Sequence, residues 1–264
     1  MLTSESPRNG LQLNRSVHRA ALLLKKLATH RQGMTLTELS GASALPESTV
    51  YRLLATLQRE GFVERAGDGS GRFQMGLEMF RLGSAVLDRL GIGQQVLTYL
   101  EQLAAETGET VNLGTLHGFH VLYLQKVESH QSLRASLTVG SASVPAHCSA
   151  NGKMLLSQLD DENLRSLLDS HRLDAQGPNS IVDRAALMVE LHSIRNHGYA
   201  VDDLEFAADI RAVAAPIRNH QGTTVAAVAV ASPATRMSLE RAHALAPTVM
   251  KVAGDISKRL GHQW

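Results

Sequence analysis

Two short amphipathic segments with a tight connection, within residues 35–65, constrain the fold of this chain more than any other feature. Thr35 and Glu38 have the spacing of a capping box, in which the hydroxyl and the carboxylate each bind a free amide of the first helical turn. We therefore expect a helix to begin after Thr35. A second helix is predicted to begin at Pro46, because a proline at the first helical position loses no hydrogen bond.

The second of these helices has two different faces. Its apolar residues recur at helical spacing and form one stripe toward a core: Val50, Leu53, Leu54 and Leu57. The opposite face has a hydroxyl group near its start and arginines further along: Ser48, Arg52, Ala55 and Arg59, with Thr49 and Tyr51 on the flanks. This face suits a helix in the DNA major groove, where short residues approach base edges and arginines reach bases or phosphates. An ordinary surface helix has the same division, so the helix alone leaves both interpretations open.

The next residues favour DNA binding. Residues 62–65 and 72–75 have the pattern of two short strands around the turn AGDGSG. A hairpin directly after a helix-turn-helix makes a winged helix, and it brings Arg72 beside the DNA backbone.

Length and charge indicate two domains of different character. A chain of 264 residues with 44% hydrophobic residues is long enough for two cores. Residues 1–76 carry ten Lys and Arg against six Asp and Glu, a net charge of +4, and the remainder carries −3. The basic part coincides with the helix-turn-helix, a modest asymmetry that is consistent with phosphate attraction.

We predict a cytoplasmic protein that does not enter a membrane. The longest uninterrupted apolar run, residues 225–231, is too short for a membrane helix, and the N-terminus lacks the apolar core of a signal peptide. The single cysteine, Cys148, fits a reducing compartment.

Around the helix-turn-helix, residues 1–14 are expected to be disordered and residues 16–30 to form a helix that closes the small core. Residues 76–91 have a helical pattern with apolar residues on most of the circumference. Such a helix must be buried on more than one side. We expect it to pair with the same helix of a second subunit, which also places two reading helices on one side of DNA.

The remaining chain predicts an α+β domain with one antiparallel sheet, helices on one face and a pocket on the other. The predicted strands are residues 110–116, 121–127, 133–139, 211–218 and 223–232, with strand character also at 198–201. The predicted helices are residues 93–107, 150–159, 161–170, 183–197 and 238–260.

Candidate chemistry in this domain is sparse. The sequence NGKM at 151–154 lacks the residues that a Walker loop requires at 147 and 154, so Lys153 is expected in the first turn of a helix. Cys148 is expected to be buried packing rather than a nucleophile. The pair His117 and His120 is a weak zinc candidate. We predict no catalytic residue, no metal and no cofactor.

Three nearby carboxylates follow the predicted strand at 198–201: Asp202, Asp203 and Glu205. General acid and base roles are chemically possible for them, but no nucleophile or metal motif accompanies them. Ligand binding and a structural role both remain open.

Seven stretches together resemble the IclR family of bacterial transcriptional regulators, from about residue 14 to residue 260. They are TLTELS, LPESTVYRLLATLQREGFVER, RFQMGLEMFRLG, ETGETVNLGTL, VPAHCSANGKMLL, GYAVDDLEF and IRAVAAPI. The resemblance implies a winged helix-turn-helix at 15–76, a linker and dimerisation helix at 77–92, and a GAF-like effector-binding domain at 93–264. It also implies a homodimer or dimer of dimers on double-stranded operator DNA.

The resemblance implies two sets of site residues. The DNA contacts fall on Arg19, Ser48, Thr49, Tyr51, Arg52 and Arg72. The effector contacts fall on Ala150, Asn151, Asp202, Ala212, Ala229 and Ala231. Glu47 departs from the family pattern, in which basic or neutral residues are common, and its charge is expected to reduce affinity for phosphates.

Three of the effector positions differ from relatives that bind small carboxylates. Such relatives tend to have Cys and two Ser where this chain has Ala212, Ala229 and Ala231. Alanines offer fewer hydrogen bonds and more apolar room. We therefore expect a larger, partly apolar effector, such as an aromatic acid, with polar contacts from Asn151 and Asp202.

The predicted function is an effector-responsive regulator, repressor or activator, of a catabolic operon. A small-molecule-processing enzyme with a fused helix-turn-helix domain is the alternative, and turnover of a ligand favours it. A constitutive architectural DNA-binding protein is a third possibility, favoured by salt-dependent binding without sequence preference.

Overall fold

A computed structural model describes residues 14–135, 139–140 and 144–263 of the chain. Its residues divide into two compact units, and the division lies between Arg89 and Leu90. The predicted disordered segment, residues 1–14, lies outside the described residues except for Asn14. The Asn14 side chain accepts the N–H groups of Ser16 and Val17 and caps the first helix.

Three helices form the core of the first unit: α1 (Arg15–Ala28), α2 (Leu36–Ser43) and α3 (Glu47–Arg59). Leu23, Leu39 and Leu54 are fully buried among them. The capping box of Thr35 and Glu38 is confirmed. The predicted start of the second helix is wrong by one residue, because Pro46 has an extended ψ of 140° and is the N-cap of α3.

The predicted wing is confirmed as β1 (Val63–Arg65) paired antiparallel with β2 (Phe73–Met75). Phe73 is buried in the three-helix core and also bridges to Met34. The hairpin is therefore held to the helices by its own hydrophobic residue.

The next helix, α4 (Leu77–Arg89), contains no buried residue. Leu77 is 80% exposed and Phe80 is 76% exposed, and Leu82 and Val86 are exposed as well. We expected these apolar side chains to be buried on more than one side of the helix. In the single chain they are exposed to solvent.

The second unit is built on a six-stranded antiparallel sheet in the order β5-β4-β3-β8-β7-β6. Its strands are β3 (Thr110–His117), β4 (His120–Val127), β5 (Val144–Pro145), β6 (Ala200–Asp203), β7 (Ile210–Arg218) and β8 (Thr224–Pro233). Its helices are α5 (Gln94–Thr107), the short η1 (Ala146–Cys148), α6 (Ala150–Ser157), α7 (Asp161–Asp169), α8 (Arg184–His197) and α9 (Leu239–Arg259).

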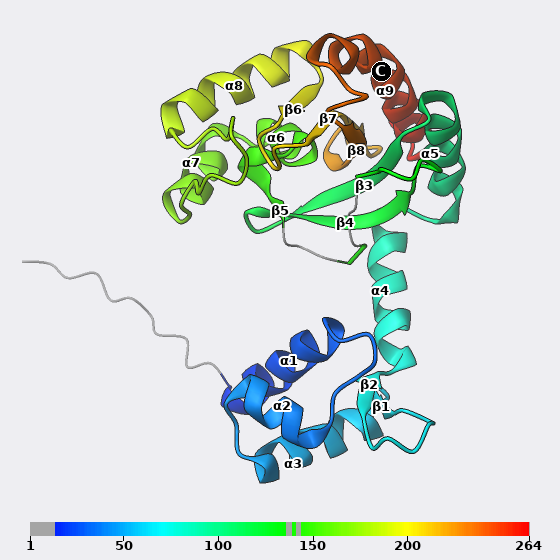
Figure 1. The fold of residues 1–264 in the computed structure, drawn as a ribbon, viewed down its shortest axis with the longest axis vertical. Helices are drawn as coiled ribbons and strands as arrows, with labels where there is room; N and C mark the ends of the chain where they lie inside the picture. Colours follow the sequence, from blue (N-terminus) through cyan, green and yellow to red (C-terminus); the bar gives the residue numbers. More distant parts are fainter. Residues whose placement is uncertain (1–13, 136–138, 141–143, 264) are drawn as a thin grey trace, which may run out of the picture. The chain divides into compact units, whose positions relative to one another are not determined.

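Helices cover both faces of this sheet, so the expectation of helices on one face only is wrong (Figure 1). The large residues of β7 and β8, such as Val213 and Val228, face α5 and α9. The alternate positions are small and face α6, α7 and α8: Ala212, Ala214, Ala227, Ala229 and Ala231. Because side chains alternate along a strand, this pattern of large and small residues allows α6 to approach the sheet closely.

One predicted strand is also wrong. Of the predicted strand 133–139, residues 133–135 and 139 are irregular or turn, and 136–138 lie outside the described residues. The composition of that stretch is strand-like, but the described residues have no pairing partner in the sheet.

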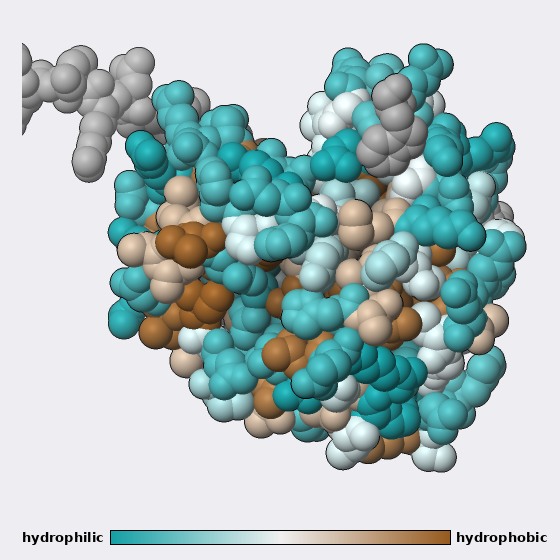
Figure 2. All heavy atoms as spheres, turned by 90° about the horizontal axis from the view of Figure 1, so that it is seen from above, coloured by the Kyte–Doolittle hydropathy of each residue, from teal (hydrophilic) through white to brown (hydrophobic). Residues whose placement is uncertain are grey.

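Every helix of the described residues is too short or too polar to be a transmembrane span. The face shown in Figure 2 is mostly hydrophilic, with hydrophobic residues in groups between the polar ones.

Candidate functional site

The outer face of α3 presents most of the predicted DNA contacts. Ser48, Tyr51 and Arg52 are exposed there, and Thr49 is half-buried. Val50, Leu54 and Leu57 anchor the inner face of the helix in the core. The exposed residues are therefore held on a fixed element and are free to meet a partner.

Glu47, at the start of α3, has a partner inside the unit. Its Oε1 accepts the hydroxyl of Thr37 at 2.7 Å, which links α3 to α2. A carboxylate in the first turn of a helix is also favoured by the helix dipole. The hydrogen bond and the favourable interaction with the helix dipole together give Glu47 a structural role. Glu47 is also the residue that the resemblance to the family singled out as a departure.

Arg19 lies on α1 and borders a groove between α1 and α3. The groove is lined by Arg19, Thr49 and Arg52, together with Ser16 and Thr56. The structure thus brings three of the predicted DNA contacts to one surface, although Arg19 and Arg52 are 33 positions apart in the sequence.

Arg72 is placed differently from the other predicted contacts. Its guanidinium donates to both carboxylate oxygens of Glu38, at 2.9 and 3.1 Å, and to the Gly33 carbonyl oxygen at 3.0 Å. The same Glu38 carboxylate accepts the backbone N–H of Thr35 at 2.8 Å. Arg72 therefore joins the wing to the capping box of α2.

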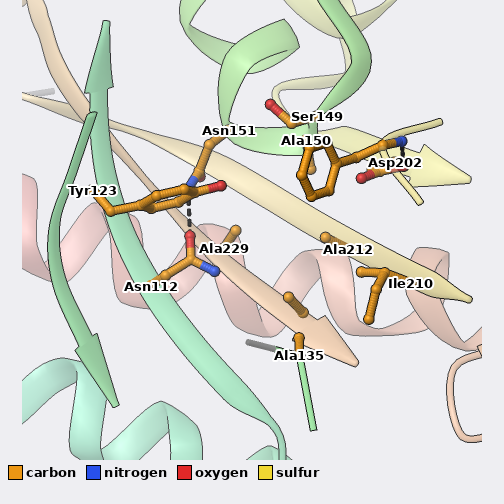
Figure 3. A pocket seen from close by; sticks show the side chains of 12 residues that line it. Asn112, Tyr123, Ala135, Ser149, Ala150, Asn151, Asp202, Ile210, Ala212 and Ala229 are labelled. Carbon is orange, nitrogen blue, oxygen red and sulfur yellow. Dashed lines mark hydrogen bonds between the residues drawn. The ribbon is translucent and has the colours of Figure 1, made fainter. Parts of the chain in front are cut away.

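In the second unit, all six predicted effector residues line one cavity (Figure 3). The empty space of the cavity, counted together with its opening to solvent, is about 440 Å³. Ala212, Ala229 and Ala231 come from β7 and β8 and form its floor, and Ala150 and Asn151 come from the start of α6. The resemblance had indicated these positions, and cross-strand register brings them together.

The start of α6 forms part of the wall of this cavity. The Ser149 hydroxyl caps the helix by accepting the N–H of Gly152 at 3.2 Å. Among the residues described here, none accepts the backbone N–H of Ala150 or Asn151, as is usual in a first helical turn. These donors and the positive end of the helix dipole can bind an anion or a carbonyl oxygen.

Six further lining residues were not predicted from the sequence: Asn112, Tyr123, Ala135, Ser149, Phe206 and Ile210. Asn112 is a polar residue between the apolar Val111 and Leu113 of β3, and it lies opposite Ala229 of β8. A single amide side chain within an otherwise mostly apolar strand could have indicated from the sequence that Asn112 has a functional role.

Asp202 is the carboxylate that reaches the cavity. It is 2% exposed, and its Oδ1 accepts the backbone N–H groups of Glu205 at 2.8 Å and Phe206 at 3.3 Å. Burial raises the pKa of Asp202 to about 7, and the nearby Glu205 carboxylate contributes to the increase. Near neutral pH this group can therefore either accept or donate a hydrogen bond.

The two neighbouring carboxylates have other partners. Asp203 accepts from the guanidinium of Arg211 at 2.6 Å. Glu205 accepts from the ammonium of Lys153 at 2.5 Å, and Lys153 also donates to Glu190 at 3.1 Å. Lys153 lies in the first turns of α6, as predicted, but its burial to 1% exposure was not anticipated.

The remaining candidates do not form a reactive or metal-binding group. Burial raises the pKa of the Cys148 thiol to about 12, so the nucleophilic thiolate is scarce at neutral pH. His117 and His120 face each other across the β3–β4 turn. In the part of the chain that the structure describes, no three His, Cys, Asp or Glu residues are arranged to hold a metal ion.

Two family descriptions match the chain. The IclR helix-turn-helix domain matches residues 16–67, and the C-terminal domain of bacterial transcriptional regulator IclR matches residues 84–258.

Individual proteins agree with these matches. The chain is 35% identical over 243 residues to the HTH-type transcriptional regulator BhcR of Paracoccus denitrificans, covering 92% of this chain and 86% of that protein. It is 32% identical over 248 residues to the transcriptional repressor IclR of Escherichia coli, covering 93% and 90%. A crystal structure of an IclR homolog complexed with 4-hydroxybenzoate, from Microbacterium hydrocarbonoxydans, superimposes with a TM-score of 0.80 at 26% identity, covering 93% of this chain and 98% of that one.

Proposed function

Because this chain belongs to the IclR family of bacterial transcriptional regulators, we propose that it controls a catabolic operon in response to a small organic effector. The family consists of DNA-binding transcriptional regulators with an effector-binding C-terminal domain, and these are not enzymes. The alternative of an enzyme with a fused helix-turn-helix is therefore wrong. The observation that carries the proposal is the cavity in which all six predicted effector residues meet.

We propose that the three parts of the chain have the separate roles that the family resemblance implies. Residues 15–76 bind operator DNA, residues 77–92 link and dimerise, and residues 93–264 bind the effector in the cytoplasm. The proposed DNA contacts are Arg19, Ser48, Thr49, Tyr51, Arg52 and Arg72. Support comes from the exposed face of α3 and from the groove that Arg19 shares with Thr49 and Arg52.

The proposed effector is a partly apolar molecule, such as an aromatic acid. The floor of the cavity is formed by three alanines, and Ile210 adds a larger apolar side chain. Asn151, Asp202 and the open N–H groups at the start of α6 supply the polar contacts. The related IclR homolog whose structure contains 4-hydroxybenzoate supports an aromatic acid as a first candidate.

We propose that α4 pairs with the α4 of a second subunit. Its exposed Leu77 and Phe80 need a partner to leave water. A two-fold dimer presents two copies of α3 to a near-palindromic operator, as two half-sites require. Two such dimers can associate further into a dimer of dimers.

In this proposal, effector binding changes the spacing of the two α3 helices in the dimer. Linkage requires that operator DNA change the affinity for the effector by the same factor as the effector changes the affinity for DNA. A ligand that alters DNA binding without this reciprocity acts by another route.

The test is footprinting of the full-length protein on the region upstream of its own gene, with and without a panel of organic acids. We expect a protected near-palindromic site, and an aromatic acid is expected to change its protection. The direction of that change distinguishes a repressor released by its ligand from an activator. Binding without sequence preference contradicts the proposal and supports the architectural alternative. Tight binding of glyoxylate or pyruvate, without any response to aromatic acids, contradicts the proposed effector class.

A further inference from the structure

Two buried asparagines are joined at one end of the effector cavity. Asn112, on β3, and Asn151, at the start of α6, are each 2% exposed. The Nδ2 group of Asn151 donates to Oδ1 of Asn112 at 2.5 Å (Figure 3). This bond fixes the orientation of each amide relative to the other.

The oxygen of Asn151 and the nitrogen of Asn112 have no hydrogen-bond partner among the described residues. Oδ1 of Asn151 is buried and has no hydrogen-bond partner. Nδ2 of Asn112, which lines the cavity, is turned toward it in Figure 3, and the hydrogen bond of this side chain within the described structure uses its oxygen instead. If the oxygen and nitrogen of both amides are exchanged, Asn112 becomes the donor and Asn151 the acceptor of the bond between them. One oxygen and one nitrogen still have no partner in the described part of the chain, because each amide has one donor group and one acceptor.

The fold makes room for this arrangement. Gly114, two residues after Asn112 on β3, lies beneath the Asn151 amide. A Cβ atom at Gly114 would lie 3.3 Å from Asn151 Nδ2 and 2.6 Å from a methyl group of Val121. A larger residue at position 114 would therefore clash with Val121 and press against the Asn151 amide.

Unpaired buried amide groups are costly in a folded protein. Satisfying both groups requires an acceptor for the Asn112 N–H and a donor for the Asn151 oxygen. A hydroxyl has both functions, because its oxygen accepts a hydrogen bond and its proton is donated in another. A carboxylate contains acceptors only, so it leaves the Asn151 oxygen unpaired.

Charge in the cavity agrees with this distinction. The described cavity wall contains no Lys, Arg or His, and it contains the carboxyl group of Asp202. A carboxylate placed against the asparagine pair therefore gains no cation there. The open N–H groups of Ala150 and Asn151 remain as the site for an acidic group of the same ligand.

We propose that Asn112 and Asn151 form a hydroxyl-recognition subsite, so that the effector is a hydroxylated aromatic acid rather than an unsubstituted one. This inference rests on the proposed effector function of the cavity. It assigns a specificity-determining role to Asn112, which the family resemblance did not indicate.

The experiment measures binding of four probes to the full-length protein by isothermal titration calorimetry: benzoate and the 2-, 3- and 4-hydroxybenzoates. At least one hydroxylated isomer is expected to bind about tenfold or more tightly than benzoate, because benzoate leaves the buried amide groups unpaired. In Asn112→Ala, the affinity ratio between that isomer and benzoate is expected to fall below about twofold.

A matched control variant shortens an apolar side chain of the cavity wall and leaves Asn112 and Asn151 unchanged. Ile210→Ala is expected to weaken binding of both probes while the ratio between them stays at its wild-type value. Thermal unfolding confirms that each variant is folded. If Asn112→Ala does not fold, Asn112→Ser serves in its place, and the wild-type ratio is an independent test.

The outcomes separate this inference from the proposed function. If benzoate binds wild-type protein as tightly as every hydroxylated isomer, the proposed hydroxyl-recognition subsite is wrong, while the proposal that the cavity binds the effector is unaffected. An unchanged ratio in Asn112→Ala also overturns the assignment. If no probe binds a protein that still binds its operator, both the aromatic effector class and the subsite are wrong.

Discussion

Arg72, beside the wing, and Glu38, in the first turn of α2, form a two-point ion pair, with nitrogen–oxygen distances of 2.9 and 3.1 Å. The backbone N–H of Thr35 and the guanidinium of Arg72 lower the pKa of the Glu38 carboxyl. One carboxylate thus closes the capping box and holds the wing. The pair also neutralises a guanidinium that we propose as a DNA contact.

This arrangement predicts opposite effects for two substitutions. Arg72→Ala is expected to weaken operator binding and to reduce the slope of log affinity against log salt by about one unit, because it removes a phosphate contact. Glu38→Gln is expected to strengthen binding, since it removes a negative charge and releases Arg72. Electrophoretic mobility shifts at several salt concentrations measure both. If Glu38→Gln weakens binding as much as Arg72→Ala does, Arg72 acts only through the fold.

Arg52→Ala is expected to reduce operator affinity by about 1–3 kcal/mol if the guanidinium reads a base. Arg52 is exposed on α3, so the fold and effector binding are expected to remain intact. Fluorescence anisotropy with labelled operator measures the loss. Lys251→Ala is the matched control, because it removes one exposed positive charge from α9 in the other unit. Equal affinity of Arg52→Ala and wild type contradicts the assignment.

Restoring polar groups to the cavity floor is expected to reverse the effector preference. The triple variant Ala212→Cys, Ala229→Ser and Ala231→Ser adds hydrogen-bonding groups and reduces apolar room. We expect about tenfold or greater gain in pyruvate affinity and a loss of affinity for aromatic acids, as measured by calorimetry. If the triple variant binds pyruvate no better than wild type, the three alanines do not determine the effector class.

The raised pKa of Asp202 leads us to predict that the stability of the folded protein depends on pH in a specific way. Burial raises its pKa from 3.8 to about 7, so between these values the folded protein keeps a proton that the unfolded chain releases. The free energy of unfolding therefore falls as pH rises through this window. Asp202→Asn keeps the Oδ1 acceptor and cannot ionise, so it is expected to gain stability relative to wild type, on the order of a few kcal/mol, between about pH 4.5 and pH 8.

Urea denaturation of both proteins across that range measures the difference. Glu205, Lys153, Cys148 and Tyr123 interact electrostatically with Asp202, and they are unchanged in the variant. A stability difference that does not vary with pH shows that Asp202 titrates outside this window.

The buried ion pair of Lys153 and Glu205 predicts a large effect on stability. Lys153→Met leaves the Glu205 carboxylate buried without its partner, which is expected to cost about 3–5 kcal/mol. Adding Glu205→Gln to Lys153→Met is expected to recover part of that loss, because no unpaired charge remains. Chemical denaturation of the two single variants and the double variant gives the coupling energy. If Lys153→Met is as stable as wild type, the ion pair makes no net contribution.

Local patterns in the sequence predicted much of the first unit. The capping box of Thr35 and the glycine-rich turn between β1 and β2 act within a few residues, so they can be recognised without the fold. The one-residue error at Pro46 has the same local origin, because a proline suits both the N-cap and the first helical position there. By contrast, the contact between Arg72 and Glu38 spans 34 positions, and no local signal indicated it.

In the second unit, local sequence patterns predicted the five longer helices and five of the six strands of the sheet. They did not indicate β5 or the short η1, and they placed a strand at 133–139 that the described residues there do not form. Family resemblance indicated six cavity residues. The tertiary structure decided the rest. Strand register aligns Asn112 with Ala229, and Ala212 with Ala231. Close packing of α6 then brings Asn151 onto Asn112 and buries Lys153. Register and packing depend on contacts between residues far apart in the chain, and a single sequence does not display such contacts.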